Sequence, residues 1–216
     1  DPDNWMEIWN NVFMEYNRID ENTLVKLPKQ NVDTGMGLER ANCILQGKTS
    51  VYLTEVFQPI IKTIEELSNY TYGTDEEKDK SVRIIADHSR SSVFILGDQR
   101  GVTPDRVGAG YVLRRLIRRA VRHGMKLGIE ESFLAKIAET VVANFKIAYP
   151  ELEQNSEKIY KELTAEEEKF RKTLLKGEAE FQKLLPNLMK NPKKIISGKV
   201  AYNLYETYGF PLELTQ

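Results

Sequence analysis

VDTGMGLER, residues 32–40, is the stretch at which the spacing of apolar residues changes along this chain. In EIWNNVFMEYNR, residues 7–18, aromatic and β-branched residues recur with a period of two, which is typical of a β-strand. From Gly37 to Gly47 the apolar residues instead follow the 3.6-residue period of a helix. The sequence therefore predicts strands before this stretch and helices after it.

The strands are expected to form a β-hairpin. Its first strand covers residues 6–18, and residues 20–22 are the polar cluster of a turn. The chain then returns through residues 23–27 as an antiparallel strand. Pro28 is expected to end that strand because proline has no N–H to donate, so that only a short extended piece, residues 31–33, follows.

Everything after Gly47 has helical periodicity. The expected helices cover residues 54–69, 81–96, 111–123, 132–148 and 156–185, and a last one runs from a cap at Ser197 to Gly209. These patterns predict an α+β fold that is mainly α, with residues 1–53 as a first domain and residues 54–216 as a helical domain. A boundary within the polar loop at residues 70–80 is the alternative.

The neutral overall charge of the chain is a cancellation. The 216 residues carry 31 Lys and Arg against 32 Asp and Glu, for a net charge of −1. Residues 83–128, however, contain ten Lys and Arg against three Asp, whereas residues 151–169 contain seven Glu against three Lys. The basic segment is large enough to favour an anionic partner.

The composition excludes several classes of protein. Cys43 is the only cysteine and is accompanied by two histidines, so an internal disulfide and a structural zinc cluster are excluded. No stretch approaches 18 apolar residues, and the first residues lack the pattern of a signal peptide. We expect a cytoplasmic protein with no structural metal and no membrane partner. Because the chain begins with Asp1, we also expect a cut inside a longer protein.

The stretch at residues 32–40 combines a carboxylate, two glycines and an arginine. Asp33 at a strand end can hold an ammonium group, and Arg40 in the first turns of a helix can bind a phosphate bidentately. Gly35 and Gly37 allow a ligand to approach the backbone closely. The alternative is a tight turn with a structural ion pair between Asp33 and Arg40.

The same string, with EIWNNVFMEYNR and LPK before it, resembles motif 3 and the preceding strand of the class II alanyl-tRNA synthetases. The resemblance implies that Asp33 binds the amino group of alanine and that Asn10 helps to position the amino acid. It also implies that Gly35 lines the alanine pocket, and that Gly37 and Arg40 contact ATP. These roles agree with the chemistry of the residues themselves.

A second candidate site is the basic helix GYVLRRLIRRAVRHG, residues 110–124. Its arginines follow one another at helical spacing with no acid between Tyr111 and His123, and like charges four residues apart repel by a few tenths of a kcal/mol. We expect phosphate groups to relieve this repulsion. The alternatives are a solvated face, or pairing with Glu from the acidic helix that follows. The five arginines are Arg114, Arg115, Arg118, Arg119 and Arg122.

This helix, with IIADHSRSSVFILGD before it and AYNLYETYGFPLELT near the end of the chain, resembles the helical tRNA-recognition domain of alanyl-tRNA synthetases. The resemblance implies binding of the tRNA acceptor stem. Two positions depart from the family pattern for reading the G·U pair of that stem: Arg106 replaces the usual asparagine, and Glu206 replaces the usual aspartate. Glu206 can still accept a hydrogen bond, whereas Arg106 can only donate. We therefore expect acceptor-stem binding without G·U discrimination by the usual pair.

The resemblance implies a parent enzyme that activates alanine with ATP and Mg²⁺ and transfers it to tRNA(Ala). Motifs 1 and 2 of class II catalysis are not visible in this chain, and neither is the zinc motif of an editing domain. We therefore expect a fragment consisting of the last strands of the catalytic sheet, motif 3 and the tRNA-recognition domain. Its expected partners are the acceptor stem of tRNA(Ala), alanine, ATP and the remainder of the same polypeptide. Three behaviours of the isolated chain compete: an RNA-binding module without catalysis, which we expect, an active ligase, and a scaffold without ligand.

The remaining conspicuous residues have structural interpretations. His88 is expected to serve packing or RNA contact rather than catalysis, and Cys43 is expected to be an inert core thiol. Trp5 and Trp9 are expected in the core. The acidic helix at residues 156–185 is expected to be a long amphipathic strut.

Overall fold

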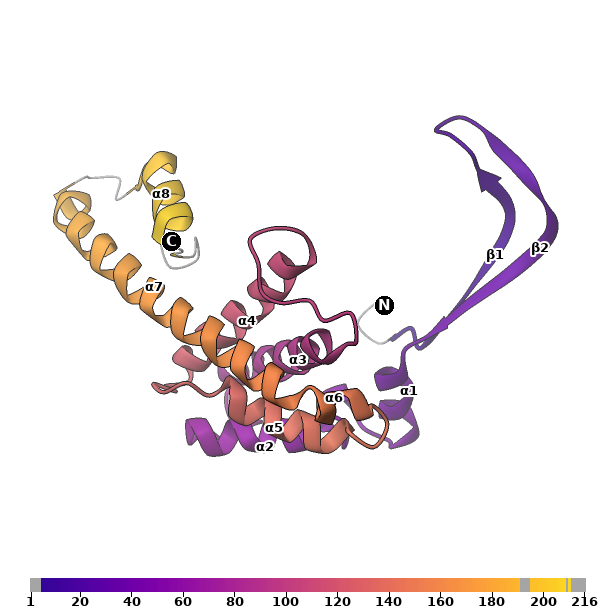
Figure 1. Cartoon of the computed structure of the whole chain (residues 1–216), viewed down its shortest axis with the longest axis horizontal. Helices are drawn as coiled ribbons and strands as arrows, with labels where there is room; N and C mark the ends of the chain where they lie inside the picture. The colour runs from indigo at the N-terminus through magenta and orange to yellow at the C-terminus, as the bar shows by residue number, and fades with distance from the viewer. Residues whose placement is uncertain (1–4, 191–194, 209, 211–216) are drawn as a thin grey trace. The chain divides into compact units, whose positions relative to one another are not determined.

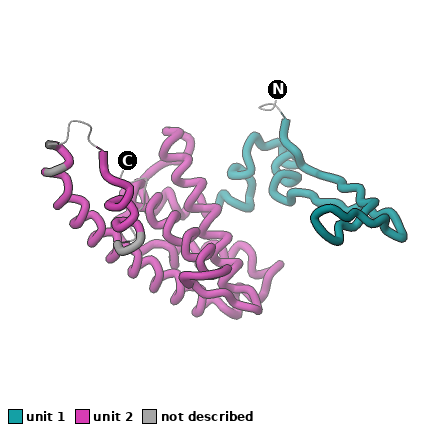
Figure 2. Tube along the Cα trace, turned by 90° about the horizontal axis from the view of Figure 1, so that it is seen from above, with its two compact units in different colours: residues 1–58 teal, residues 59–216 magenta. Residues whose placement is uncertain are grey.

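The computed structural model describes residues 5–190, 195–208 and 210 (Figure 1). Of Asn187, Lys190 and residues 206–208 only the backbone is described. The chain divides into two compact units, residues 1–58 and 59–216 (Figure 2), where the sequence places the boundary at 53/54. The first unit contains the described strands and the second is helical, so the prediction of an α+β, mainly α fold is confirmed.

The first unit is a hairpin followed by short helices. Strands β1 (Trp9–Arg18) and β2 (Leu24–Met36) pair antiparallel, as predicted from the period of two. The turn between them is closed by a hydrogen bond from the Ile19 N–H to the Thr23 carbonyl, 3.1 Å long. Helix α1 (Leu38–Leu45) and the 3₁₀ helix η2 (Val51–Leu53) complete the unit.

The prediction that Pro28 ends the second strand is wrong, because β2 continues through it. The pairing shifts between Tyr16, which faces Lys26, and Met14, which faces Asn31, so residues 27–30 bulge opposite the single residue Glu15. A bulged residue needs no ladder hydrogen bond, so the missing N–H of proline costs nothing there. The Glu15 carboxylate receives the Gln30 amide at 3.1 Å and the Lys26 amine at 3.6 Å across the bulge.

The prediction that Trp5 and Trp9 belong to a core is also wrong. Their exposed fractions are 85% and 60%, and Phe13 on β1 is 79% exposed. A strand buries a face only where a second layer covers it. Among the described residues no such layer covers these side chains, so apolar residues of both hairpin faces remain exposed.

The second unit is an assembly of helices with its own apolar core. Its largest fully buried side chains include Ile60, Ile85, Leu113, Ile117 and Ile137. Every expected helix is present, and one short helix, α6, was not expected. The helices are α2 (Gln58–Ser68, which starts at the division), α3 (Glu76–Gly97), α4 (Gly108–Lys126), α5 (Leu134–Phe145), α6 (Pro150–Gln154), α7 (Ser156–Lys190) and α8 (Gly198–Tyr208).

Several helix boundaries differ from the prediction: α2 starts four residues later than expected, α4 continues through Gly124 to Lys126, and α5 is shorter at both ends. Helix α3 starts five residues earlier than expected because the carboxylate of Asp75 caps it, accepting the Lys78 N–H at 2.9 Å. Helix α7 does not end before Pro186 but continues to Lys190. A proline removes one hydrogen bond from a helix interior, which here does not end the helix.

A buried carboxylate joins α7 to α5. Glu167 of α7 is fully buried and accepts the backbone N–H groups of Phe133, at 3.2 Å, and Leu134, at 3.0 Å, which belong to the free N-terminus of α5. Arg171 donates from Nε to the same carboxylate at 3.0 Å. Burial raises the pKa of Glu167, against the opposing effect of these donors. The N-terminus of α5 is thus capped by a side chain 33 residues away in the sequence.

Helices α3 and α4 meet through a buried histidine, and a glycine lies nearby. His123 of α4 places Nδ1 3.0 Å from the hydroxyl oxygen of Ser81 on α3. Burial, with the positive charge of Arg122 next in effect, lowers the pKa of His123 to about 4. The next residue, Gly124, packs against the ring of Phe133. A Cβ built at Gly124 would lie only 2.3 Å from that ring.

Candidate amino-acid and nucleic-acid sites

The residues predicted to contact alanine lie on one face of the hairpin. Asn10 on β1 is directly opposite Gly35 on β2, and Val12 is opposite Asp33. Directly opposed residues point to the same side of a sheet, and residues two apart on one strand also share a face. Asn10, Gly35 and Asp33 are therefore neighbours on that face.

The backbone around Asp33 is held by short-range hydrogen bonds. The Asp33 carboxylate accepts the N–H of Thr34 at 2.9 Å, and the Thr34 hydroxyl donates to the Asn10 carbonyl at 3.3 Å. The indole N–H of Trp9 donates to the same hydroxyl oxygen. Asp33 itself is exposed and retains acceptor capacity for an ammonium group.

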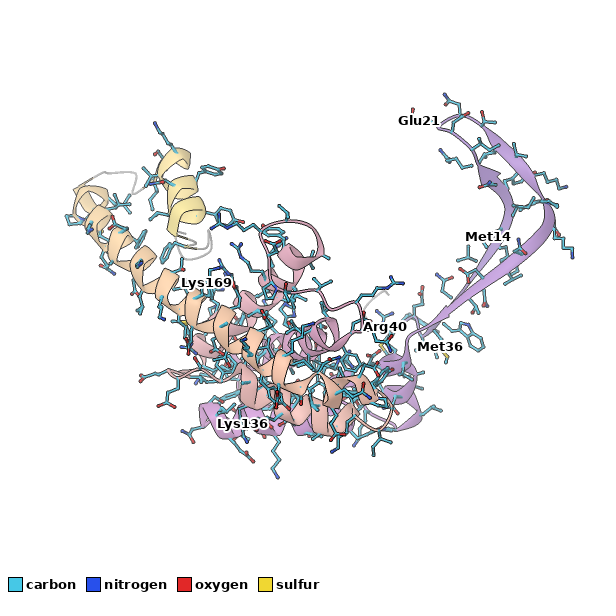
Figure 3. All side chains as sticks on the ribbon, in the orientation of Figure 1. Met14, Glu21, Met36, Arg40, Lys136 and Lys169 are labelled. Carbon is cyan, nitrogen blue, oxygen red and sulfur yellow. The ribbon has the colours of Figure 1, made fainter. Side chains whose placement is uncertain are left out.

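Arg40 is anchored at the base of the hairpin, where β2 passes into α1 (Figure 3). Its guanidinium donates to the Glu7 carbonyl at 2.7 Å, and the Gly37 N–H donates to the Ile8 carbonyl at 3.0 Å. A Cβ at Gly37 would lie 3.4 Å from the Arg40 side chain, an ordinary van der Waals contact. Arg40 is exposed, and a guanidinium has five N–H groups, so donors remain for an anion.

The arginines of α4 fall into groups that the sequence does not distinguish. Arg114 and Arg118 face α7, where both approach Glu166, which is only 6% exposed. The Arg118 Nε lies 2.6 Å from Glu166 Oε1, and the Arg114 Nε lies 3.8 Å from the same oxygen. The Arg118 guanidinium also lies 4.9 Å from the centre of the Phe170 ring. For these two arginines the structure has the partner that the sequence offered as an alternative to phosphate, a glutamate of the following helix.

Burial also affects the pKa of Arg114, which lies next to the Arg118–Glu166 ion pair. Burial and the neighbouring charge of Arg118 lower the pKa of Arg114, while Glu166 raises it. Arg106 in the loop before α4 is another positive neighbour that lowers it. Glu166 therefore offsets repulsion within the basic cluster.

Arg115 and Arg119 face solvent. The Arg115 guanidinium lies 5.8 Å from the centre of the Tyr111 ring, and the Tyr111 hydroxyl lies 3.3 Å from that of Tyr205 on α8. Arg119 is close enough to Asp87 of α3 to contribute to lowering the pKa of that carboxyl, for which the hydrogen bond with His88 is the main cause. Neither exposed arginine forms an ion pair within the described part of the chain.

The other predicted nucleic-acid contacts have varied surroundings. Arg122 is half-buried on α4, whereas Arg106 is exposed, with its backbone N–H bonded to the Asp105 carboxylate at 2.6 Å. Glu206 lies on α8, but its side chain is outside the described residues. The tail segment at residues 211–215 that contributed to the resemblance also lies outside them.

His88 and Cys43, for which the sequence predicts structural roles, both contact neighbouring groups. His88 places Nδ1 2.9 Å from the neighbouring Asp87 carboxylate and is largely packed. Cys43 is buried, as predicted, and its thiol donates to the Lys48 carbonyl at 3.2 Å.

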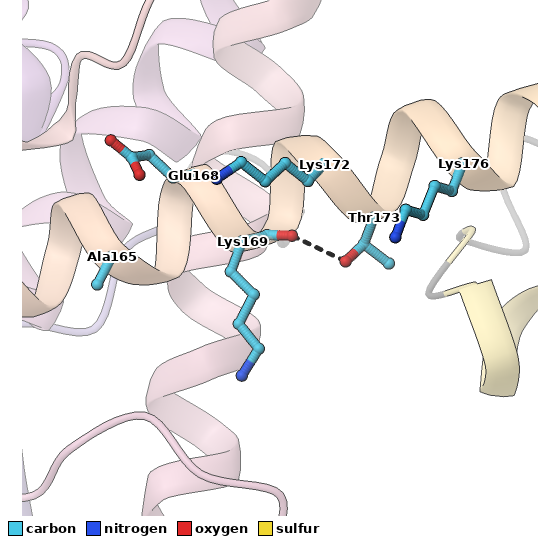
Figure 4. A pocket seen from close by; sticks show the side chains of 6 residues that line it. All are labelled: Ala165, Glu168, Lys169, Lys172, Thr173 and Lys176. Atoms are coloured by element: carbon cyan, nitrogen blue, oxygen red, sulfur yellow. Dashed lines mark hydrogen bonds between the residues drawn. The ribbon is translucent and has the colours of Figure 1, made fainter.

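Sequence reasoning missed a group of basic residues on α7. Lys169, Lys172 and Lys176 are exposed and line a hollow together with Ala165, Glu168 and Thr173 (Figure 4). Their spacing of three and four residues was visible in the sequence, but the acidic start of the same helix obscured it. Within the described residues there is no group of three or more metal-ligating side chains, and no described helix is both long and apolar enough to cross a bilayer.

Comparison with known proteins identifies the family of this chain. The family of tRNA synthetases class II (A) matches residues 1–216. Alanine–tRNA ligase of Treponema denticola is 59% identical over 212 residues, which are 98% of this chain and 35% of that protein. The alanine–tRNA ligases of Borreliella burgdorferi and Natranaerobius thermophilus are 51% and 45% identical, over 98% and 100% of this chain and 35% and 24% of their own lengths. The chain thus spans about a third or less of these relatives, and it belongs to the class II (A) family of tRNA synthetases.

Proposed function

We propose that the helical unit binds the acceptor stem of tRNA(Ala), and that the hairpin with α1 contributes the alanine and ATP contacts of an alanine–tRNA ligase. The observation that carries the first part is the pair of exposed arginines, Arg115 and Arg119, on a helix without acids. The relatives named above, all alanine–tRNA ligases, support the choice of RNA. In the whole enzyme, ATP with Mg²⁺ would activate alanine before transfer to the tRNA.

Within the hairpin, each motif 3 residue has a distinct task in this proposal. Asp33 accepts the ammonium group of alanine, beside Asn10 and the open backbone at Gly35, where no described atom lies within 4 Å of a Cβ position. Arg40, held by the Glu7 carbonyl, directs its remaining N–H groups at a phosphate of ATP. The described residues contain no cluster of Mg²⁺ ligands, so the step that uses Mg²⁺ is not assigned to this chain.

The tRNA contacts divide according to their burial. Arg115 and Arg119 contact phosphates, because their guanidinium groups are exposed and have no carboxylate partner among the described residues. Arg114 and Arg118 act chiefly through Glu166, which orients α4 against α7. Arg122 and Arg106 extend the positive surface along α4 and into the loop before it, and Glu206 of α8 accepts a hydrogen bond from a base.

The test of RNA binding is a titration of the chain with an acceptor-stem hairpin over a series of salt concentrations. Replacing Arg115 and Arg119 by Gln should weaken binding and reduce the salt slope by about one for each phosphate that is no longer neutralised. The matched control replaces the exposed Lys62 and Lys80, on α2 and α3, by Gln. Equal effects of both double variants, or a flat salt dependence of the unaltered chain, would contradict the proposal.

The second candidate function is RNA binding without catalysis. It is favoured by the exposure of Asp33 and Arg40, because a reactive adenylate requires a site that excludes water. We expect the isolated chain to show no alanine-dependent exchange of pyrophosphate into ATP. Exchange by this chain, abolished by Asp33→Ala, would instead show that it is an active ligase.

Recognition of the G·U pair is a separate question for the same assay. Arg106 can donate but cannot accept a hydrogen bond, so it cannot satisfy both kinds of base edge as an asparagine amide does. We expect acceptor stems with G·U and with G·C at this pair to bind with affinities within a few-fold of each other. A strong preference for G·U would refute this expectation.

A further inference from the structure

The row of lysines on α7 has no carboxylate partner among the described residues. Lys169, Lys172 and Lys176 lie at intervals of three and four residues, and no carboxylate lies within ion-pair distance of their amines in the described part of the chain. Further along α7, Lys183 has such a partner, Glu180, at 2.6 Å. Lysines at this spacing repel one another unless an anion lies between them.

Helical geometry places this row beside the arginines of α4. The contact of Arg118 with Glu166 and Phe170 fixes which sides of α4 and α7 face each other. Successive helical residues are rotated by about 100°. On α7, the buried core residues Leu163 and Leu174 are rotated to one side of this contact. Lys169 and Lys176 are rotated to the opposite side.

The same construction applies to α4. Relative to Arg118, the exposed Arg115 and Arg119 are rotated to one side, and the buried Ile117 and Val121 to the other. Both helices turn their buried residues to the same core. Arg115 and Arg119 of α4 and Lys169 and Lys176 of α7 therefore line the same solvent-facing side of the α4–α7 contact, with the Arg118–Glu166 pair between them. Lys172 lies next to Lys169 and Lys176, further round α7 and away from α4.

We propose that the α7 lysine row, Lys169, Lys172 and Lys176, is a second phosphate-binding surface for the RNA that contacts Arg115 and Arg119. The inference rests on the proposed function and extends RNA binding from α4 to α7, a helix whose first turns are rich in glutamate. Two positive rows separated by a neutralised strip match a duplex, in which each of two backbones carries a line of phosphates. Arginines on one row and lysines on the other provide bidentate contacts on α4 and point charges on α7.

The first test replaces all three lysines by Gln in the full chain. Binding of an acceptor-stem hairpin RNA should weaken about tenfold or more, and the salt slope should fall by about two to three. The matched control replaces Lys62, Lys78 and Lys80, which are exposed on α2 and α3, and should change affinity less than twofold. Circular dichroism of both variants establishes that the helices are retained.

The second test needs no variant. Acetylation of the unaltered chain, with and without the hairpin RNA, should show Lys169, Lys172 and Lys176 protected at least severalfold by RNA, and Lys62, Lys78 and Lys80 unprotected. Normal affinity of the α7 triple variant together with unprotected lysines would overturn the lysine surface. If the Arg115 and Arg119 double variant still weakened binding in that case, the proposed RNA-binding function would stand without the lysine surface. A chain that binds no RNA at all would overturn both the proposed function and the lysine surface.

Discussion

The hairpin and the α4–α7 pair hold their functional side chains in different ways. In the hairpin, Asn10, Gly35 and Asp33 are neighbours because strand register places them on one face, and they remain exposed. In the helical unit, Arg114 and Arg118 resemble Arg115 and Arg119 in sequence but differ from them in space, because Glu166 pairs with only the first two. The pairing of two strands thus suffices to bring the hairpin residues together, whereas the role of a helical charge depends on what packs against it.

If the role of a charged side chain in the helical unit depends on packing, neighbouring glutamates of α7 should contribute very differently to the free energy of unfolding. Glu167→Ala should lower the free energy of unfolding by about 3 kcal/mol, because it leaves Arg171 without its carboxylate and two buried N–H groups of α5 without an acceptor. Glu168→Ala, at an exposed position, should cost about 0.5 kcal/mol or less. Urea denaturation followed by circular dichroism measures both, and similar losses would contradict the capping role of Glu167.

Two glycines provide a comparison between the units. Gly124→Ala should cost about 2 kcal/mol, because its new Cβ would clash with the Phe133 ring. Gly35→Ala should cost about 0.5 kcal/mol or less, because nothing lies within 4 Å of its Cβ position. Thermal denaturation of the two variants should therefore show a clear shift only for Gly124→Ala. A larger loss from Gly35→Ala would mean that the hairpin face is covered after all.

The helical unit should also lose stability in acid through His123. Because burial lowers the folded-state pKa of His123 to about 4, below the unfolded value of about 6.5, the unfolded chain binds more protons between these pH values. The histidine's contribution to stability is therefore fully present above about pH 6.5 and is lost as the pH falls through about 4. His123→Gln should flatten this part of the stability profile relative to the unaltered chain. An unchanged slope would show that His123 is accessible to protons in the folded protein.

The smallest effect is expected on the hairpin. Phe13→Ser should change the free energy of unfolding by about 0.5 kcal/mol or less, since the side chain is already 79% exposed. Ile117→Ala in the helical core serves as the contrasting variant and should cost about 3 kcal/mol. Chemical denaturation monitored by circular dichroism compares the two. A loss from Phe13→Ser near that of Ile117→Ala would remove the distinction between the units.

Much of the fold could be predicted because it depends on short-range patterns. The period of two over residues 7–18 and the helical period after Gly37 place β1 and α1 correctly, and the turn cluster at residues 20–22 places the start of β2. The continuation of β2 through Pro28 could not be predicted, because a bulge depends on how the two strands pair. The exposure of Trp5 and Trp9 could not be predicted either, since an aromatic residue in a strand pattern does not show whether another layer covers it.

The candidate sites divide in the same way. The positions of Asp33 and Arg40 at a strand end and in a helix follow from the sequence, while the anchoring of Arg40 by the Glu7 carbonyl depends on the closed hairpin. On α4 the sequence indicates a basic helix but treats its arginines as equivalent. The relation of Lys169 and Lys176 to these arginines emerges only when α7 packs against α4.

The consecutive glutamates 166–168 show most clearly what each level determines. The sequence by itself determines that all three lie on one helix and that successive side chains point about 100° apart. Only the tertiary structure decides that Glu166 meets the arginines of α4, that Glu167 caps α5, and that Glu168 faces solvent beside the lysine row. The physical reason is that a carboxylate acquires its role from the donors and the burial around it, and those come from segments far away in the chain.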